Sequence, residues 1–186
     1  MDFVKLIHTD IDHERLARDL FDVISKFNLT EYSQISVTSM EGNDDWECGN
    51  GKISKLKYPE RYFRVINNSI KDSYISECVK RYSDFYRWRI LKLKPKYSYS
   101  IHSDGNGVHN NLRLHIPIIT NKESFLAFYD ILPNHKETAR VYFEHLEVGN
   151  SYIVDTTNLH TAVNYGTTDR YHLVGVKYEN SNNWSH

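Results

Sequence analysis

"YSIHSDGNGVHNNLRLHIPIITN" spans residues Tyr99 to Asn121 and places aliphatic, strand-forming residues beside histidine, aspartate and arginine. Alternate residues of a strand share one face. In the second half of this stretch, one face holds Leu112, Leu114, Ile116 and Ile118, and the other holds Arg113, His115 and Pro117. A polar face in contact with water would explain the pattern, and so would a polar interior that binds a metal and an anion.

The segments around this stretch predict the fold. From residue 87 onward, short runs rich in β-branched and aromatic residues are separated by turn residues, which predicts about eight strands. The first half predicts two helices, at 12–27 and 69–86, because apolar residues recur there at helical spacing. We therefore expect an α+β fold: a double-stranded β-helix (jelly roll, cupin-like) with N-terminal helices packed on one face. An immunoglobulin-like sandwich is the alternative, but the helical first half argues against it.

Length and composition place limits on the class of protein. The 186 residues predict a single domain. We expect a mixed, helical part at 1–86, a jelly-roll core that carries the metal site at 87–178, and a tail at 179–186. Net charge is −1 and no large basic stripe is visible, so a nucleic-acid partner is not expected. The sequence shows no signal peptide or membrane-spanning run, and its two cysteines lack a CxxC pattern, which predicts a cytoplasmic protein without membrane contact.

Three residues form a candidate metal site. His102 and Asp104 are separated by one residue, so on a strand they point to the same side. His160 can supply a third ligand. Two histidines and one carboxylate form the facial triad of non-haem Fe(II) oxygenases, which leaves coordination positions for a 2-oxo acid and O2. Zinc chemistry is less natural here, because no catalytic base is obvious beside the three residues.

Arg170 is the candidate cosubstrate anchor. It follows His160 across the turn "YGTTD", and we expect a hairpin to place it on the strand next to the His160 strand. A guanidinium there would bind the distal carboxylate of 2-oxoglutarate through two parallel hydrogen bonds. The pattern therefore predicts Fe(II), 2-oxoglutarate and O2 as cofactors and cosubstrates.

Four segments resemble a known family as a set: "KPKYSYSIHSD", "LRLHIPIITN", "YIVDTTNLHTAVNYG" and "RYHLVG". They resemble the aspartyl/asparaginyl β-hydroxylase-like branch of the Fe(II)/2-oxoglutarate dioxygenases, especially small bacterial and phage members. The resemblance implies the same metal ligands and the same arginine anchor. It also implies that His115 lies against the cosubstrate and that Arg113 lies near cosubstrate and substrate acid. The aspartyl hydroxylases proper lack the acidic ligand that Asp104 would supply, so the resemblance does not fix an aspartyl side chain as substrate.

The predicted activity is hydroxylation of an unactivated C–H bond, with release of succinate and CO2. The substrate is an amino acid, a peptide or protein side chain, or a related small molecule. One alternative is a metal-binding cupin without catalysis, acting as a sensor or small-molecule binding module; it would have no use for Arg170. Another is a sheet protein whose histidines lie on the surface. Trp46, in the glycine-rich loop 41–52, is either part of a lid over the substrate or a packing anchor.

Overall fold

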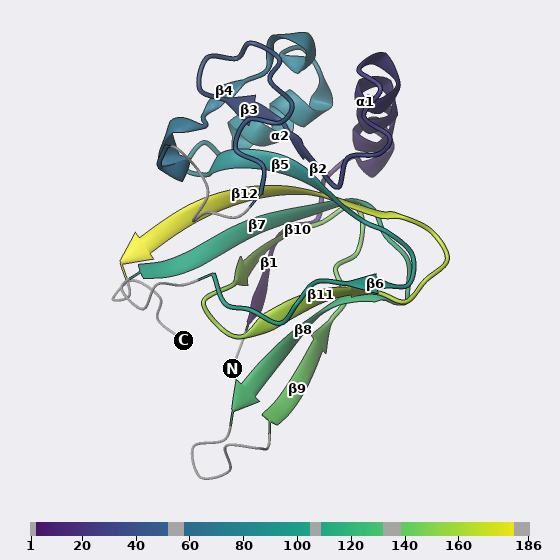
Figure 1. The fold of residues 1–186 in the computed structure, drawn as a ribbon, viewed down its shortest axis with the longest axis vertical. Coiled ribbons are helices and arrows are strands. Elements are labelled where there is room, and N and C mark those ends of the chain that lie inside the picture. The colour runs from purple at the N-terminus through teal and green to yellow at the C-terminus, as the bar shows by residue number, and fades with distance from the viewer. Residues whose placement is uncertain (1–2, 52–57, 105–108, 132–138, 181–186) are drawn as a thin grey trace.

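Two facing β-sheets make up the body of the protein, with helices on the outer face of the larger sheet (Figure 1). The computed structural model describes residues 3–51, 58–104, 109–131 and 139–180. The large sheet has the strand order β1 (Val4–His8), β10 (Ser151–Asp155), β7 (His109–Ile119), β12 (Arg170–Asn180), β5 (Tyr86–Leu93) and β2 (Gln34–Ser36). The small sheet has the order β6 (Tyr97–Ser98), β11 (His160–Asn164), β8 (Ser124–Ile131) and β9 (Ala139–Glu144).

From β5 to β12, consecutive strands alternate between the two sheets, except for β8 and β9, which pair within the small sheet. β10 lies in the large sheet, β11 in the small sheet and β12 in the large sheet again. All pairings within the two sheets are antiparallel. This is the predicted double-stranded β-helix in an α+β fold, and it rules out the immunoglobulin-like alternative.

The helical layer begins with α1 (His13–Lys26), in agreement with the predicted helix at 12–27. The Asp12 side chain caps this helix by accepting a hydrogen bond from the Arg15 backbone N–H at 3.0 Å. Its buried residues are Leu16, Leu20, Val23 and Ile24. The layer also holds α2, two 3-10 helices and a two-stranded sheet: α2 (Tyr74–Arg81), η2 (Glu60–Tyr62), η3 (Asn68–Ile70), and β3 (Thr38–Ser39) paired with β4 (Val65–Ile66).

The predicted helix at 69–86 is wrong in its extent. Ser73 caps α2 by accepting the Ser76 backbone N–H at 3.2 Å, so the helix starts later. Tyr86 already belongs to β5, where it pairs with Val176 of β12. Apolar residues that precede and follow α2 in the sequence face the same core as the helix. The sequence therefore shows an apolar pattern that is longer than the helix itself.

The core has two parts, one on each side of the large sheet. The helix-side core joins α1 and α2 to residues of the sheet such as Trp88, Ile116 and Leu173. Trp46 belongs to this part: it is 7% exposed and its ring lies 4.8 Å from that of Phe27. Trp46 is therefore a packing anchor, which is one of the two roles that the sequence predicted for it.

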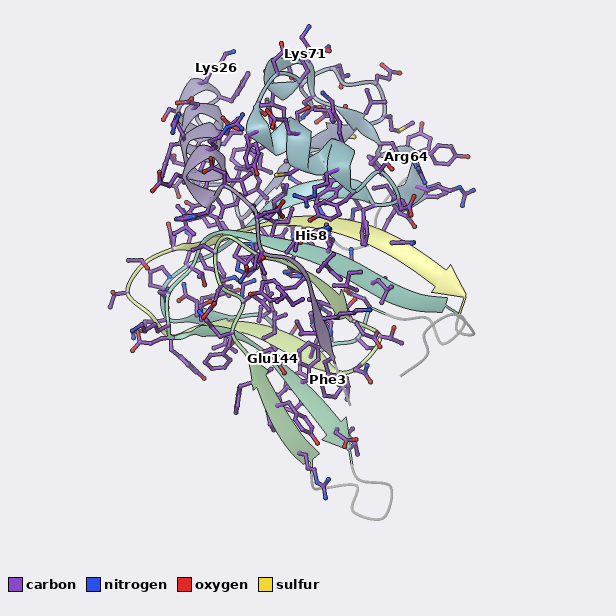
Figure 2. All side chains as sticks on the ribbon, turned by 180° about the vertical axis from the view of Figure 1, so that it is seen from behind. Phe3, His8, Lys26, Arg64, Lys71 and Glu144 are labelled. Carbon is purple, nitrogen blue, oxygen red and sulfur yellow. The ribbon has the colours of Figure 1, made fainter. Side chains whose placement is uncertain are left out.

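The second part of the core lies between the sheets. Phe3 stacks on Phe128 of β8 at a ring-centroid distance of 4.7 Å. Figure 2 shows Phe3 on the side of the small sheet, with Lys26 and Lys71 projecting from the helical layer on the other side of the large sheet. This apolar cluster fills part of the space between the sheets, and polar side chains line the rest of it.

The first 86 residues contribute β1 and β2 to the large sheet, one at each edge. The division of the chain at residue 87 stays a prediction. None of the helices in the described ranges is both long enough and apolar enough to cross a membrane.

Candidate metal centre

The polar face of β7 points between the two sheets. Arg113 and His115 are 5% and 6% exposed, and Arg170 and His172 on the neighbouring strand β12 are 2% exposed each. On the opposite face, Leu114 and Ile116 of β7 and Leu173 of β12 belong to the helix-side core, so both faces are buried. The reading in which the Arg-x-His faces contact water is wrong, and the alternative of a polar interior holds.

His102, Asp104 and His160 come together at one edge of this interior. Each offers one potential ligand atom, and these atoms all lie within 4.8 Å of one another. His102 forms an antiparallel bridge with His160 of β11, and the backbone N–H of Asp104 donates to the Thr156 carbonyl at 2.9 Å. These contacts hold the segment that carries His102 and Asp104 beside the first residue of β11, and this brings the three side chains together.

Hydrogen bonds fix the tautomers of both histidines. His102 Nδ1 lies 2.7 Å from the Ser100 carbonyl, and His160 Nδ1 lies 2.9 Å from the Asn158 carbonyl. A carbonyl oxygen only accepts, so each Nδ1 carries a proton, and Nε2 is the nitrogen left to bind a metal. Burial lowers the pKa of His160, although the bond to Asn158 opposes this shift, so its ring is neutral at pH 7. In both rings the Nδ1 hydrogen bond leaves Nε2 as the atom that can bind a metal.

Arg113 orients the carboxylate of Asp104. Its Nε and one Nη donate to Asp104 Oδ2 at 3.1 and 3.0 Å. The other oxygen, Oδ1, lies 3.7 Å from His102 Nε2. Burial alone would raise the pKa of Asp104, but the positive charge of Arg113, helped by His160 and His102, lowers it from 3.8 to about 2. The carboxylate is therefore ionised at neutral pH, with one oxygen held by Arg113 and the other turned toward the histidines.

The donor set fits a divalent transition metal. It consists of two imidazole Nε2 atoms and one carboxylate oxygen, and each side chain is held by a further hydrogen bond to its non-ligating atom. The described residues bring together no other group of three or more potential ligands of this kind. That the three residues bind a metal stays a prediction, which this geometry supports.

Arg170 lies in the same interior but not where the hairpin prediction put it. β11 pairs with β6 and β8, whereas β12 pairs with β5 and β7, so the His160 and Arg170 strands lie in opposite sheets. Burial lowers the pKa of Arg170 to about 10, against the opposing effect of Tyr99, so the guanidinium stays charged at pH 7. Its Nε is buried and has no hydrogen-bond partner among the described residues. A buried, unpartnered donor is costly, which points to a missing acceptor.

His115 forms a pair with His172. Their Nδ1 atoms lie 3.3 Å apart, so one ring donates and the other accepts. Burial, followed by the charge of Arg170, lowers the pKa of each histidine well below its ordinary value. Both rings are neutral at pH 7. The role of His115 beside a cosubstrate stays a prediction.

The sequence argument missed three buried charged groups near this site. Arg87 of β5 forms a buried ion pair with Glu60 and donates to the carbonyl oxygens of Gly49 and Gly51, both at 2.7 Å. Arg89, two residues further along β5, is 6% exposed. The alternation in "RWRILKLK" carried the signal: a third strand places two arginines on the face that Leu93 shares with the inter-sheet core.

Comparisons with known proteins find similarity in structure and none in sequence. No protein-family model matches the chain, and no curated protein matches it. AviO1 from Streptomyces viridochromogenes Tue57 aligns with a TM-score of 0.54 at 14% identity, over 97% of this chain and 90% of its own. The non-heme alpha ketoglutarate dependent epimerase SnoN from nogalamycin biosynthesis aligns with a TM-score of 0.53 at 13% identity, over 97% and 78%.

A prolyl hydroxylase from Trichoplax adhaerens aligns with a TM-score of 0.52 at 13% identity, over 98% of this chain and 86% of its own. Two further matches, with TM-scores of 0.40 and 0.41, span only 50% and 43% of their own chains and add no argument. At these identities the likeness shows the fold, a double-stranded β-helix shared with non-haem oxygenases. It does not distinguish the aspartyl/asparaginyl β-hydroxylase-like branch, so that narrower resemblance stays a prediction.

Proposed function

We propose that this protein is an Fe(II)- and 2-oxoglutarate-dependent dioxygenase that hydroxylates an unactivated C–H bond. The observation that carries the proposal is the hydrogen bonding of the three candidate ligands. The Nδ1 atoms of His102 and His160 each donate a hydrogen bond to a backbone carbonyl, and Arg113 binds one oxygen of Asp104. Each side chain thereby keeps one ligand atom available, within 4.8 Å of the others. A single hydrogen bond of this kind also occurs at an exposed histidine, so the convergence of three such side chains is what supports a metal site.

Iron bound with 2-oxoglutarate supplies the oxidising chemistry: one oxygen atom of O2 enters the substrate C–H bond, and the other enters succinate as CO2 leaves. The chain's residues supply the setting for that chemistry. His102, Asp104 and His160 would hold the metal on one side and leave its other side open. Arg113 keeps Asp104 ionised and oriented, which makes it a positioning residue for this ligand; that it also lies near cosubstrate and substrate acid stays a prediction.

Arg170 would bind the distal carboxylate of 2-oxoglutarate. Its charge is retained despite burial, and its Nε lacks an acceptor among the described residues. An Arg–carboxylate pair with two parallel bonds would satisfy that donor. His115 and His172, neutral and buried, would line the cosubstrate pocket beside Arg170 and add no charge to it. The substrate is an amino acid, a peptide or protein side chain, or a related small molecule.

The test begins with binding in the absence of oxygen. Mn(II) is titrated into the protein by calorimetry, and 2-oxoglutarate is then titrated into the Mn(II) form. Arg170→Gln should weaken 2-oxoglutarate binding by roughly 30-fold or more, because truncating one partner of a buried charged pair costs ~2–5 kcal/mol, while Mn(II) affinity stays unchanged. Wild-type cosubstrate affinity in Arg170→Gln would remove the anchor from the proposal.

Catalysis is tested with Fe(II), ascorbate, 2-oxoglutarate and the small molecules of a cell lysate in air. Succinate should form together with a product that has gained one oxygen atom by mass spectrometry, and both should disappear in His160→Ala. The matched control is His145→Ala, an exposed histidine with the same Nδ1-to-carbonyl bond, at 2.7 Å to Ser124, but outside the ligand group. Tight metal binding without succinate would favour the non-catalytic cupin.

A further inference from the structure

Arg89 is a buried cation whose hydrogen bonds are incomplete. It is 6% exposed, and one Nη donates to the Gln34 side-chain oxygen at 3.0 Å. Its Nε is buried and has no partner among the described residues. Gln34 is itself held in place, since its side-chain oxygen also accepts the Gly51 backbone N–H at 3.1 Å. The guanidinium is thus held through one Nη, and its Nε–H remains available to donate a hydrogen bond.

Charges in this interior do not balance without added anions. The buried charged groups of the described chain, leaving histidines aside, are four arginines and Glu60, and the partly buried Asp104 adds a second carboxylate. Glu60 pairs with Arg87, and Asp104 pairs with Arg113. Arg89 and Arg170 have no carboxylate within 4.0 Å among the described residues, and a divalent metal would add further positive charge. Buried charges are normally compensated, but within the described ranges two of these arginines have no carboxylate beside them, Arg89 as well as the Arg170 that would bind the cosubstrate.

The sheet register separates the two arginines. Arg89 pairs with Val174 of β12, whereas Arg170 pairs with Leu93, four residues further along β5. Four residues of a strand span about 13 Å, so the two guanidinium groups start from well-separated backbone positions on one interior face. Together with the two uncompensated charges, this separation favours two anion subsites over one.

The same register places Arg89 near the metal residues. Val174 also pairs with His115 of β7, so Arg89, Val174 and His115 form a row across three neighbouring strands. Burial, followed by the charges of Arg87 and Arg113, lowers the pKa of Arg89, while Glu60 and Asp104 oppose this shift. Arg89 is thus close enough to Asp104 for their charges to interact.

We propose that Arg89, supported by Gln34, binds a carboxylate of the primary substrate, which makes the substrate a small carboxylic acid, such as a free amino acid. The inference rests on the proposed function and narrows its substrate class. A guanidinium offering Nε and an Nη side by side matches the two oxygens of a carboxylate. The carboxylate would neutralise the second unpaired cation and leave the rest of the molecule to extend toward the candidate metal ligands.

The test uses propionate as the probe and propionamide as its neutral isostere. In metal-free protein, the Arg89 Nε–H resonance, assigned by its loss in Arg89→Gln, should shift on titration with propionate and not with propionamide. In protein loaded with Mn(II) and 2-oxoglutarate, which occupies Arg170, Mn(II) should accelerate relaxation of the propionate protons. Arg89→Gln should weaken propionate binding by roughly tenfold or more, with Arg89→Lys between it and wild type.

Arg170→Gln is the reciprocal control, because the opposite ligand should be affected. It should lose affinity for 2-oxoglutarate and keep the propionate response of Arg89, whereas Arg89→Gln should keep 2-oxoglutarate affinity. Circular dichroism establishes that each variant is folded, and the comparison of propionate with propionamide needs no variant.

Several results overturn the inference: no propionate response in wild type, equal responses to acid and amide, or an unchanged propionate affinity in Arg89→Gln. Loss of 2-oxoglutarate binding in Arg89→Gln also overturns it, because Arg89 would then belong to the cosubstrate. If wild type binds neither Mn(II) nor 2-oxoglutarate, the proposed function fails, and the metal-free titration still decides whether Arg89 binds an acid.

Discussion

Replacing Arg113 with methionine should weaken metal binding and make it sensitive to acid. In the folded protein the pKa of Asp104 lies at about 2, against an ordinary value of 3.8. That difference, nearly two pKa units, is worth about 2.5 kcal/mol at 1.36 kcal/mol per unit. It persists although burial acts in the opposite direction. Without Arg113 the burial effect remains and is opposed only by His160 and His102, so the pKa of Asp104 should rise.

The expected loss of Mn(II) affinity in Arg113→Met at pH 7 is roughly 10–100-fold, the usual effect of removing a partner that orients a metal ligand. At pH 5 the loss should be larger, since a proton then competes with the metal for the carboxylate. In wild type, by contrast, affinity between pH 5 and pH 7 should follow histidine protonation alone. Anaerobic calorimetry with Mn(II) at several pH values measures both effects.

Arg113→Lys is the control, because it keeps the charge but loses the double contact with Asp104 Oδ2; it should fall between wild type and Arg113→Met. Arg113 Nη1 also lies 3.8 Å from Glu60, so folding of each variant is verified by circular dichroism. Wild-type Mn(II) affinity in folded Arg113→Met across this pH range would refute the idea that Arg113 positions the ligand.

Three further outcomes are expected. His160→Ala should abolish tight Mn(II) binding in calorimetry while His145→Ala leaves it intact; equal binding in the two would exclude His160 as a ligand. The pKa of His172 is lowered well below 6.5 by burial, so below about pH 6.5 the unfolded chain takes up a proton that the folded protein refuses. Urea denaturation of metal-free protein should therefore show stability falling from pH 7 to pH 5, by up to about 1.4 kcal/mol per pH unit for this histidine, and His172→Asn should flatten the slope. Gly175→Ala would bring a Cβ to 2.8 Å from the ring of Trp88 and should destabilise by ~1–3 kcal/mol; an unchanged thermal midpoint would show that the ring yields freely.

Local alternation was a good guide to the strands and to the clustering of the candidate ligands. The two-residue period of "NLRLHIPII" separated Arg113 and His115 from the aliphatic residues, and the structure buries the two sets on opposite faces. The single-residue spacing of His102 and Asp104 likewise placed their side chains together, with ligand atoms 3.7 Å apart. Such features depend on neighbours in the chain, and strand geometry alone decides them.

Long-range pairing was less accessible. The short "YGTTD" connection suggested a hairpin, but in a double-stranded β-helix a short connection can also carry the chain to the opposite sheet, as it does between β11 and β12. The sequence patterns did not predict β1, because its residues are half-buried or exposed at a sheet edge. Arg89 escaped notice for a related reason: alternation shows that it shares a face with Leu93, but only the assembled sheets show that this face is the interior.

The burial of β7 on both faces limits how this protein can change during evolution. A strand with one wet face offers every second position to neutral substitution, but residues 112–118 offer none. A shift of one residue would put Arg113 and His115 among the apolar side chains under α1 and turn leucine and isoleucine toward the candidate metal ligands. The apolar core therefore restricts substitution at the positions on one face of this segment, and the polar site restricts it at those on the other face. In divergent relatives, this segment should keep its alternating character even where the sequence of the helical layer has changed.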